Sequence, residues 1–397
     1  MFDLALSDSE KAEFLEAARL CGYWLVNGQN TPPRPWGAVN VNGSADLGRF
    51  IEKKCPSRDY VRPAGVWLHG IYLAGLIDLQ KAPVLDKQLY AEAVELGARF
   101  LKGLQCFDER WPKAVGGFHE MYPGHDYSAP RDAATGAMGL VALYLGTGDD
   151  ECLDRAVRFG EWYAGHGSDA DGYPWDDFCL QTGEGTSRLR GDWQAGGALL
   201  YYQLWRITGD DRWKTALEKV LTVLEDICAN DPGTDTAYDF HGSNVISIGN
   251  DDFATTALFA GHQALGKQSY LDLAAVRLRA ELARQAPNGA FPGYGGTFVT
   301  ALELIEALDL APAGAEVLPP DELREPLLAA ARFGLTLQEK TSPDRFLLGG
   351  VYGQSNYATA RDVVHGRDTG YALQLWLRLA GYRASAYTVL GWETRSR

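Results

Sequence analysis

His241 and Tyr294 have the side chains and the surroundings that suit proton transfer. His241 lies in the aromatic segment 238–244. Tyr294 stands alone among the glycines of 289–296, where we expect its hydroxyl to be accessible; the alternative is an aromatic ring that packs a turn. One reaction that needs such groups is β-elimination at a uronic acid. Donors neutralise the sugar carboxylate, a base removes the C5 proton and an acid protonates the departing O4. A tyrosine can act as both base and acid where nearby cations lower its pKa from about 10.

This chemistry defines a candidate catalytic set that needs neither a metal nor a cofactor. The set consists of Tyr294, His241, Asn244 and Arg190. The six cysteines are scattered without a CxxC pair, and the histidines at 119 and 125 are separated by proline and glycine. Neither pattern is typical of a zinc site, so we expect no metal.

The chain also has enough carboxylates for a second chemistry, glycoside hydrolysis, in which one acid stays protonated as the general acid. Candidates for this role are Glu120, Asp132, Asp192, Asp251, Asp252 and Asp368. For each aspartate, capping of a helix N-terminus is the competing interpretation. Capping does not explain why arginine recurs beside these acids, because arginine opposes the positive end of a helix dipole. The recurrent arginines therefore favour an anionic ligand.

The candidate substrate-binding residues lie where long links meet the starts of apolar helices. They are Arg62, His119, Glu120, His125, Tyr127, Arg131, Asp132, Asp192, Trp193, Asn250, Asp251, Tyr352, His365 and Arg367. A third chemistry, sugar epimerisation, would need paired histidines on the apolar helices, where only His69 and His262 qualify. For these two, a hydrogen-bonded histidine of the core is the favoured interpretation.

The elements that must position these residues show an internal repeat. Segment 145–150 reads Leu-Gly-Thr-Gly-Asp-Asp, and a related Thr-Gly-Asp-Asp follows at 208–211. In both, an apolar helix ends at a glycine and another helix begins within a few residues, as in repeated helix pairs. Amphipathic helices are expected at 8–26, 86–104, 150–164, 211–229, 268–285 and 321–338. More apolar helices are expected at 60–79, 131–146, 190–207, 251–265, 296–308 and 367–380.

Alternation of solvent-facing and buried helices predicts an all-α, (α/α)6 toroid formed by residues 1–397 as a single domain, with a seventh pair as the alternative count. Links from inner to outer helices are short. Links from outer to inner helices are long and rich in glycine and aromatic residues, at about 105–130, 165–190, 230–250, 286–295 and 339–366. In a toroid these long links share one face, which we predict to hold the functional site. A non-enzymatic helical scaffold would have links of ordinary length.

Composition limits the partners of the chain. Its 397 residues include 37 Lys plus Arg against 52 Asp plus Glu, a formal charge of −15, so a nucleic-acid partner is not expected. An excess of Trp, Tyr and Gly suits stacking of sugars, so the expected partner is an anionic oligo- or polysaccharide. The acidic first residues are unlike a secretion signal, no segment is apolar enough to span a membrane, and a cytoplasmic location is expected. The sequence gives no indication of oligomeric state.

The toroid together with His241 followed by Tyr294 gives the chain a resemblance to helical-toroid polysaccharide lyases. In length and in the order of these two residues it most resembles polysaccharide lyase family 38, whose members cleave glucuronan and alginate. The resemblance covers essentially the whole chain. It implies that His241 is the base or the neutralising group, and that Tyr294 is the acid, or both acid and base. It also implies that Asn244 and Arg190 hold the carboxylate.

Overall fold

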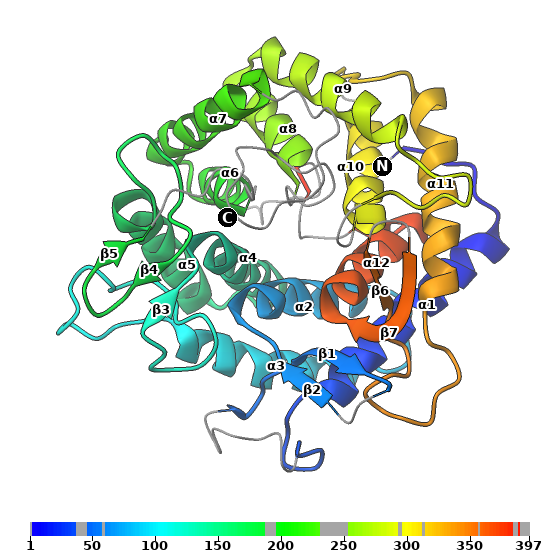
Figure 1. Ribbon diagram of the computed structural model, residues 1–397, viewed down its shortest axis with the longest axis horizontal. Coiled ribbons are helices and arrows are strands. Elements are labelled where there is room, and N and C mark those ends of the chain that lie inside the picture. The colour runs from blue at the N-terminus through cyan, green and yellow to red at the C-terminus, as the bar shows by residue number, and fades with distance from the viewer. Residues whose placement is uncertain are drawn as a thin grey trace.

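The computed structural model describes residues 2–36, 46–57, 60–186, 196–230, 253–292, 296–311, 314–355, 358–383 and 388–389. Twelve α-helices in these residues form two concentric rings (Figure 1). The outer helices are α1 (Asp8–Gly28), α3 (Lys87–Leu104), α5 (Asp150–Trp162), α7 (Arg212–Asn230), α9 (Gln268–Leu282) and α11 (Pro320–Leu337). The inner helices are α2 (Val66–Leu79), α4 (Pro130–Thr147), α6 (Gly196–Thr208), α8 (Ala254–Leu265), α10 (Gly296–Leu310) and α12 (Gly366–Leu379). Each inner helix contacts the next and α12 contacts α2, which closes the ring and confirms the predicted (α/α)6 toroid.

The repeated Thr-Gly-Asp-Asp segments are matched helix stops and starts. Gly148 and Gly209 adopt left-handed backbone conformations, with φ of 78° and 70°, directly after α4 and α6. The following aspartate, Asp149 or Asp210, then accepts a hydrogen bond from a backbone N–H two residues later and caps the next helix. Glycine is favoured at the first position because it has no Cβ, and aspartate at the second because its carboxylate accepts the free N–H groups.

Inner helices α2 and α4 approach each other closely because glycines lie at their contact. A Cβ added to Gly70 would lie 2.0 Å from the carbonyl oxygen of Thr135, and one added to Gly139 would lie 2.5 Å from the Cα of Gly70. Side chains at these positions would push the two backbones apart. Gly70 and Gly139 therefore allow α2 and α4 to pack closely.

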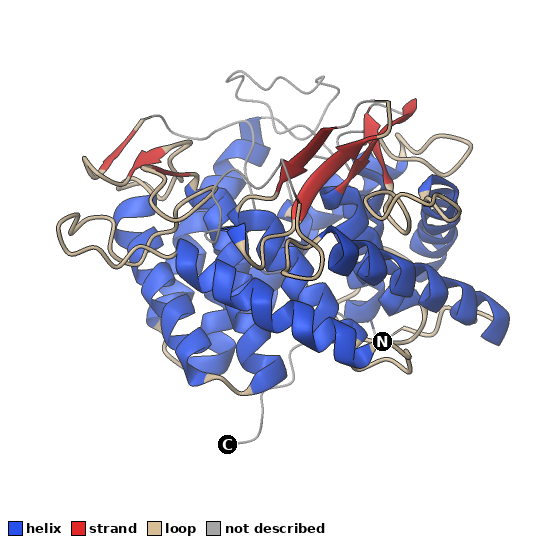
Figure 2. Cartoon of the chain, turned by 90° about the horizontal axis from the view of Figure 1, so that it is seen from below, coloured by secondary structure: helices blue, strands red, loops and turns tan. Residues whose placement is uncertain are grey.

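The segments that connect the helices contain two small sheets, which were not predicted. Four strands form an antiparallel sheet in the order β2-β1-β7-β6, and three short strands form a second antiparallel sheet in the order β3-β4-β5. The strands are β1 (Ile51–Cys55), β2 (Tyr60–Pro63), β3 (Tyr127–Ser128), β4 (Phe178–Cys179), β5 (Glu184–Gly185), β6 (Tyr352–Ser355) and β7 (Ala358–His365). All gather on one side of the helical ring, at the top of Figure 2.

That side is the N-terminal end of the inner helices. Strands β2, β3 and β7 directly precede α2, α4 and α12, so each strand leads into the first turn of an inner helix. The expected helix 60–79 accordingly begins only at Val66. Pro63 has no N–H to donate and disfavours a helical conformation at the residue before it, which suits an extended start to this segment. We call this side of the ring the mouth.

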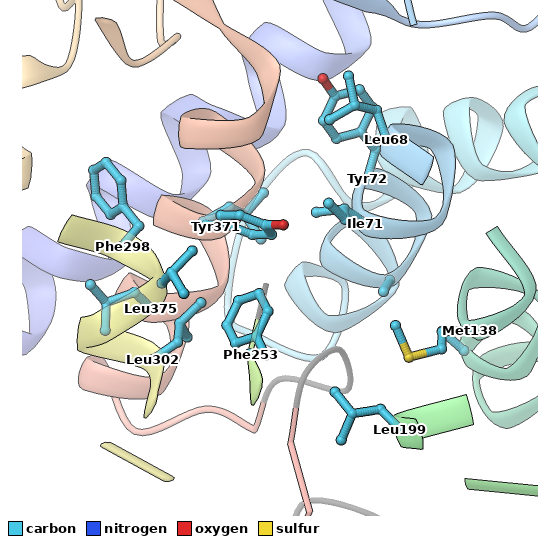
Figure 3. Close-up of a cluster of buried hydrophobic side chains, with 14 of the residues drawn as sticks. Leu68, Ile71, Tyr72, Met138, Leu199, Phe253, Phe298, Leu302, Tyr371 and Leu375 are labelled. Atoms are coloured by element: carbon cyan, nitrogen blue, oxygen red, sulfur yellow. The ribbon is translucent and has the colours of Figure 1, made fainter. Parts of the chain in front are cut away.

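The barrel interior below the mouth is filled with apolar side chains. Ile71, Met138, Leu199, Phe253 and Tyr371 come from five different inner-helix segments and converge near the axis (Figure 3). The rings of Phe253 and Tyr371 meet edge to face, with centroids 5.2 Å apart. The described side chains of the inner helices thus pack against one another at the centre of the ring. In the part of the chain that the structure describes, no helix combines the length and the apolar character needed to cross a membrane.

Candidate functional site

One group of charged side chains at the mouth surrounds Glu52 on β1. Its carboxylate lies 2.9 Å from Arg62 Nε on β2, 3.6 Å from Lys53 Nζ and 3.8 Å from His365 Nε2. The strand pairing explains this meeting. β1 lies between β2 and β7, Lys53 is opposite both Arg62 and His365, and the register shifts between Ile51 and Lys53, where Glu52 lies. Burial raises the pKa of Glu52, although Arg62 and Lys53 oppose this shift.

His365 ends β7 and caps α12. Its Nδ1 accepts a hydrogen bond from the backbone N–H of Arg367 at 3.0 Å. In the neutral ring the proton must therefore be on Nε2, the nitrogen that faces Glu52. Burial, together with the cations Lys53, Arg367 and Arg62, lowers the pKa of His365 to about 3. The ring is therefore neutral near pH 7, and Nε2–H is a hydrogen-bond donor.

A second group of charged side chains lies where α2 and α4 begin. Glu120 accepts a hydrogen bond from the N–H of Ala129, which caps α4, at 3.4 Å. Gly65 caps α2, and a Cβ there would lie 2.9 Å from Glu120 Oε1. Burial and the neighbouring charges of Asp132 and Asp177 raise the pKa of Glu120 well above its ordinary value. This carboxyl group retains its proton to a higher pH than an exposed glutamate does.

Asp132 links the two groups into one site. Its negative charge raises the pKa of Glu52 and also the pKa of Glu120, so it interacts electrostatically with both. Asp132 is itself balanced by Arg131, whose Nε lies 3.7 Å from Asp132 Oδ1. The mouth thus combines carboxyl groups of raised pKa with several cations.

A row of rings borders this site on the side of β3. His125 lies between the rings of Tyr122 and Tyr127, with centroid distances of 4.9 and 5.1 Å, and its carbonyl oxygen binds Nδ1 of His119. Burial lowers the pKa values of both histidines. Burial and the nearby carboxylates, Glu120 first, raise the pKa of Tyr127, so its hydroxyl stays protonated at neutral pH. This row offers flat rings for stacking and neutral groups for hydrogen bonding.

The structure brings most of the described candidates to the mouth. Arg62, His119, Glu120, His125, Tyr127, Arg131, Asp132, His365 and Arg367 lie on the strands, links and helix starts of this face. Arg62 is on strand β2 and not, as expected, at the start of a helix.

Tyr352 faces away from this site. It pairs with Val364 across β6 and β7, so its side chain lies on the face of the sheet opposite that of His365. Its hydroxyl donates to Glu339 Oε2 at 3.0 Å. These contacts favour a structural role for Tyr352.

The proposed catalytic set lies outside the residues that the structure describes. The same holds for several substrate-binding candidates on the same links. These residues are Tyr294, His241, Asn244, Arg190, Asp192, Trp193, Asn250 and Asp251. In sequence they precede α6, α8 and α10, three inner helices of the ring.

The two histidines on inner helices have structural contacts. The buried ring of His69 bonds Gly65 O through Nδ1 and accepts the N–H of Phe50 at Nε2. His262 bonds Lys267 O near the C-terminal end of α8, away from the mouth. The expectation of a hydrogen-bonded core histidine is confirmed for His69, whereas His262 is hydrogen-bonded but only partly buried.

Glu52, Lys53 and Asp177 belong to the site and were missed in the sequence. Glu52 and Lys53 occur in Ile-Glu-Lys-Lys-Cys, which has no motif. Their position follows from pairing with a strand more than 300 residues away. Asp177 stands beside Asp176 in a long link, and that acidic pair was the one available signal.

No protein-family model matches the chain, and no curated protein matches it. Solved structures with a similar fold do match the chain. A sugar epimerase from a ruminal bacterium superposes with a TM-score of 0.68 at 15% identity, over 94% of this chain and 99% of that one. A polysaccharide lyase superposes with a TM-score of 0.61 at 14% identity, over 94% of this chain and 97% of that one. A GH76 alpha-mannanase from Bacteroides thetaiotaomicron gives 0.60 at 16% identity, over 95% of each chain. At such identities the similarity establishes the fold, which is that of toroidal carbohydrate-active enzymes.

Proposed function

We propose that this chain is a carbohydrate-active enzyme that cleaves a uronic-acid-containing glycan, of the glucuronan or alginate type, by β-elimination at the mouth of the toroid. The observation that carries the proposal is the collection of donors at the mouth: Arg62, Lys53, Arg131 and the Nε2–H of His365. The protein as a whole has a charge of −15, so cations concentrated on one face suit an anionic substrate. The similarity to a polysaccharide lyase structure agrees with this choice.

Neutralisation of the substrate carboxylate is the step that these donors would support. Elimination is slow while the carboxylate holds its full negative charge, because the intermediate places a second negative charge beside it. Tyr294 and His241 remain the proposed proton-transfer residues, with Asn244 and Arg190 as further carboxylate ligands. They stand in the links before α6, α8 and α10, so the proposal requires these links to meet the described cluster.

Glycoside hydrolysis is the second candidate, and a specific observation favours it. Glu120 has a strongly raised pKa beside Asp132, and two carboxyl groups with different affinities for a proton are what acid-base hydrolysis needs. GH76 hydrolases share the fold, and one of them has been solved with α-1,6-mannotriose bound. Epimerisation ranks third, although sugar epimerases share the fold. His69 is buried with both ring nitrogens in structural contacts, and His262 lies near the C-terminal end of α8, away from the mouth.

The lyase proposal is tested by incubating the protein with glucuronan, alginate and a neutral mannan. The near-ultraviolet absorbance of an unsaturated uronate product and the release of reducing ends are followed together. The proposal predicts that both signals rise in parallel on a polyuronate. Release of reducing ends without absorbance would reject β-elimination and support hydrolysis. As a control on mechanism, Tyr294→Phe is expected to abolish most of the rate while the protein remains folded.

A further inference from the structure

The β1–β2 strand pair presents a carboxylate between two candidate substrate ligands, Arg62 and His365. We propose that Glu52 is a positioning residue of the mouth, which holds the Arg62 guanidinium in the orientation that receives a substrate carboxylate and fixes the His365 ring beside it. The identity of the ligand, a uronate carboxylate, rests on the proposed function. The coupling between Glu52, Arg62 and His365 follows from the contacts in the structure alone.

The contact with Arg62 uses the inner nitrogen of the guanidinium. Nε lies 2.9 Å from Glu52 Oε2, while the Arg62 side chain is 44% exposed and that of Glu52 is 10% exposed. A carboxylate bound at Nε leaves the terminal nitrogens of the fork for a second anion. Glu52 therefore fixes the direction of Arg62 from below, and the exposed end of the guanidinium faces solvent at the mouth.

The contact with His365 acts on the other ring nitrogen from the one that caps α12. The backbone N–H of Arg367 holds Nδ1, and Glu52 Oε1 lies 3.8 Å from Nε2. This distance is too long for a direct hydrogen bond, so Glu52 acts on the Nε2–H of the ring through its charge.

The charges that face Glu52 come from four parts of the fold. Arg62 and Lys53 on the strand pair and Arg49 just before it are positive, and Asp132 on α4 is negative. His365 at the start of α12 is neutral. Without the charge of Glu52, the cations would repel each other and Arg62 would lose its anchor. Removal of Glu52 therefore leaves the cationic side chains in the site but changes where they point.

The backbone of β1 gives Glu52 a rigid base. The hydroxyl of Tyr72 on α2 donates to Ile51 O at 3.1 Å. On α12, a Cβ added to Gly366 would lie 2.8 Å from Glu52 O and 1.6 Å from the Tyr72 hydroxyl. Because Gly366 has no side chain, α12 packs directly against β1 and α2. The carboxylate of Glu52 therefore extends from a strand held by two inner helices.

The test compares Glu52→Gln with a matched control, Glu95→Gln, which removes an exposed glutamate paired with Arg99 on the outer helix α3. Glutamine keeps the size of Glu52 and removes its charge. On the polyuronate that the assay above identifies as a substrate, Glu52→Gln is expected to lower kcat/KM by roughly 10- to 100-fold with the fold intact, because Arg62 and His365 would no longer be held in place. Protonation of Glu52 contributes to the loss of activity of the parent protein at low pH. The low-pH side of the activity profile should therefore differ between Glu52→Gln and the parent. Glu95→Gln should match the parent in both respects.

A second measurement does not depend on activity. In protein with ¹⁵N-labelled histidine, the ring nitrogens of His365 are expected to report the Nε2–H form. Glu52→Gln should shift them more than those of any other histidine, whereas Glu95→Gln should leave them in place. Unchanged His365 signals in Glu52→Gln would overturn the inference. If the signals move but no polyuronate is cleaved, the proposed function fails and the positioning role of Glu52 stands.

Discussion

Glu120 shows most clearly what single residues contribute to the mouth. It is buried between the starts of α2 and α4, and Asp132 and Asp177 act on it with like charges. Burial and this repulsion both favour the protonated form. A protonated carboxyl group can donate a hydrogen bond to a sugar oxygen, a function that an exposed glutamate lacks at neutral pH.

The state of Glu120 predicts a dependence of stability on pH. The folded protein keeps the proton to a higher pH than the unfolded chain, in which the pKa is close to its ordinary value of 4.5. The stabilisation from this group is therefore complete below that pH and is lost as pH rises toward the folded pKa. Glu120→Gln removes this loss, so its free energy of unfolding relative to the parent should increase between pH 5 and pH 8. The limit is about 1.4 kcal/mol per pH unit.

Urea unfolding of both proteins across this pH range measures the difference. A difference that stays flat, or that falls with pH, would show that Glu120 is ionised in the folded protein. Glu95→Gln, which replaces an exposed glutamate on the outer helix α3, serves as the control for the substitution itself.

At the scale of elements, the helices follow from local sequence and the strands do not. A glycine follows α4 and another follows α6, and each is followed by an aspartate that starts the next helix. The ends of these helices could therefore be predicted to within a few residues. Strand β1 pairs with β7, and Lys53 lies opposite His365 although more than 300 residues separate them. Local patterns carry no information about such pairing. For this reason Arg62 and His365 could be predicted as site residues, whereas Glu52, which lies between them, could not.

The contact between α2 and α4 gives a prediction at the same scale. Gly70→Ala places a Cβ 2.0 Å from Thr135 O, and neither backbone can move without shifting its helix. We expect a loss of about 1–3 kcal/mol in the free energy of unfolding. Gly103→Ala is the matched control, because it lies in α3 with one contact near 4 Å and should stabilise the protein by about 0.5–1 kcal/mol. Equal effects of the two substitutions on thermal unfolding would contradict the close contact.

At the scale of the whole molecule, the two ends of the toroid differ. The mouth carries strands, long links and the charged site, whereas the other end is closed by a buried ion-pair network. Arg378 on α12 lies 2.7 Å from Glu306 and 2.8 Å from Asp309, both on α10. Glu306 also accepts the N–H of Val389 at 2.6 Å. The chain near its C-terminus is thus fastened to the inner ring.

This network predicts a large cost for removing its cation. Arg378→Ala removes the cation from the buried carboxylate of Glu306 and the partly buried one of Asp309, and should lower the free energy of unfolding by about 3–5 kcal/mol. Arg99→Ala, which breaks an exposed pair on α3, should cost less than about 1 kcal/mol. Chemical denaturation of both variants decides between these values. A small effect of Arg378→Ala would mean that the network contributes little to closing this end of the ring.

The mass balance of the products is the most direct test of the proposed cleavage of a uronate-containing glycan by elimination at the mouth. Purified oligoglucuronate or oligoalginate of one length is incubated with the protein, and the products are weighed by mass spectrometry. Elimination adds no water, so the masses of the two fragments should sum to the mass of the parent oligosaccharide. Fragments whose masses together exceed the parent by one water would contradict the claim and identify a hydrolase. A product with the mass and length of the parent but altered stereochemistry would identify an epimerase.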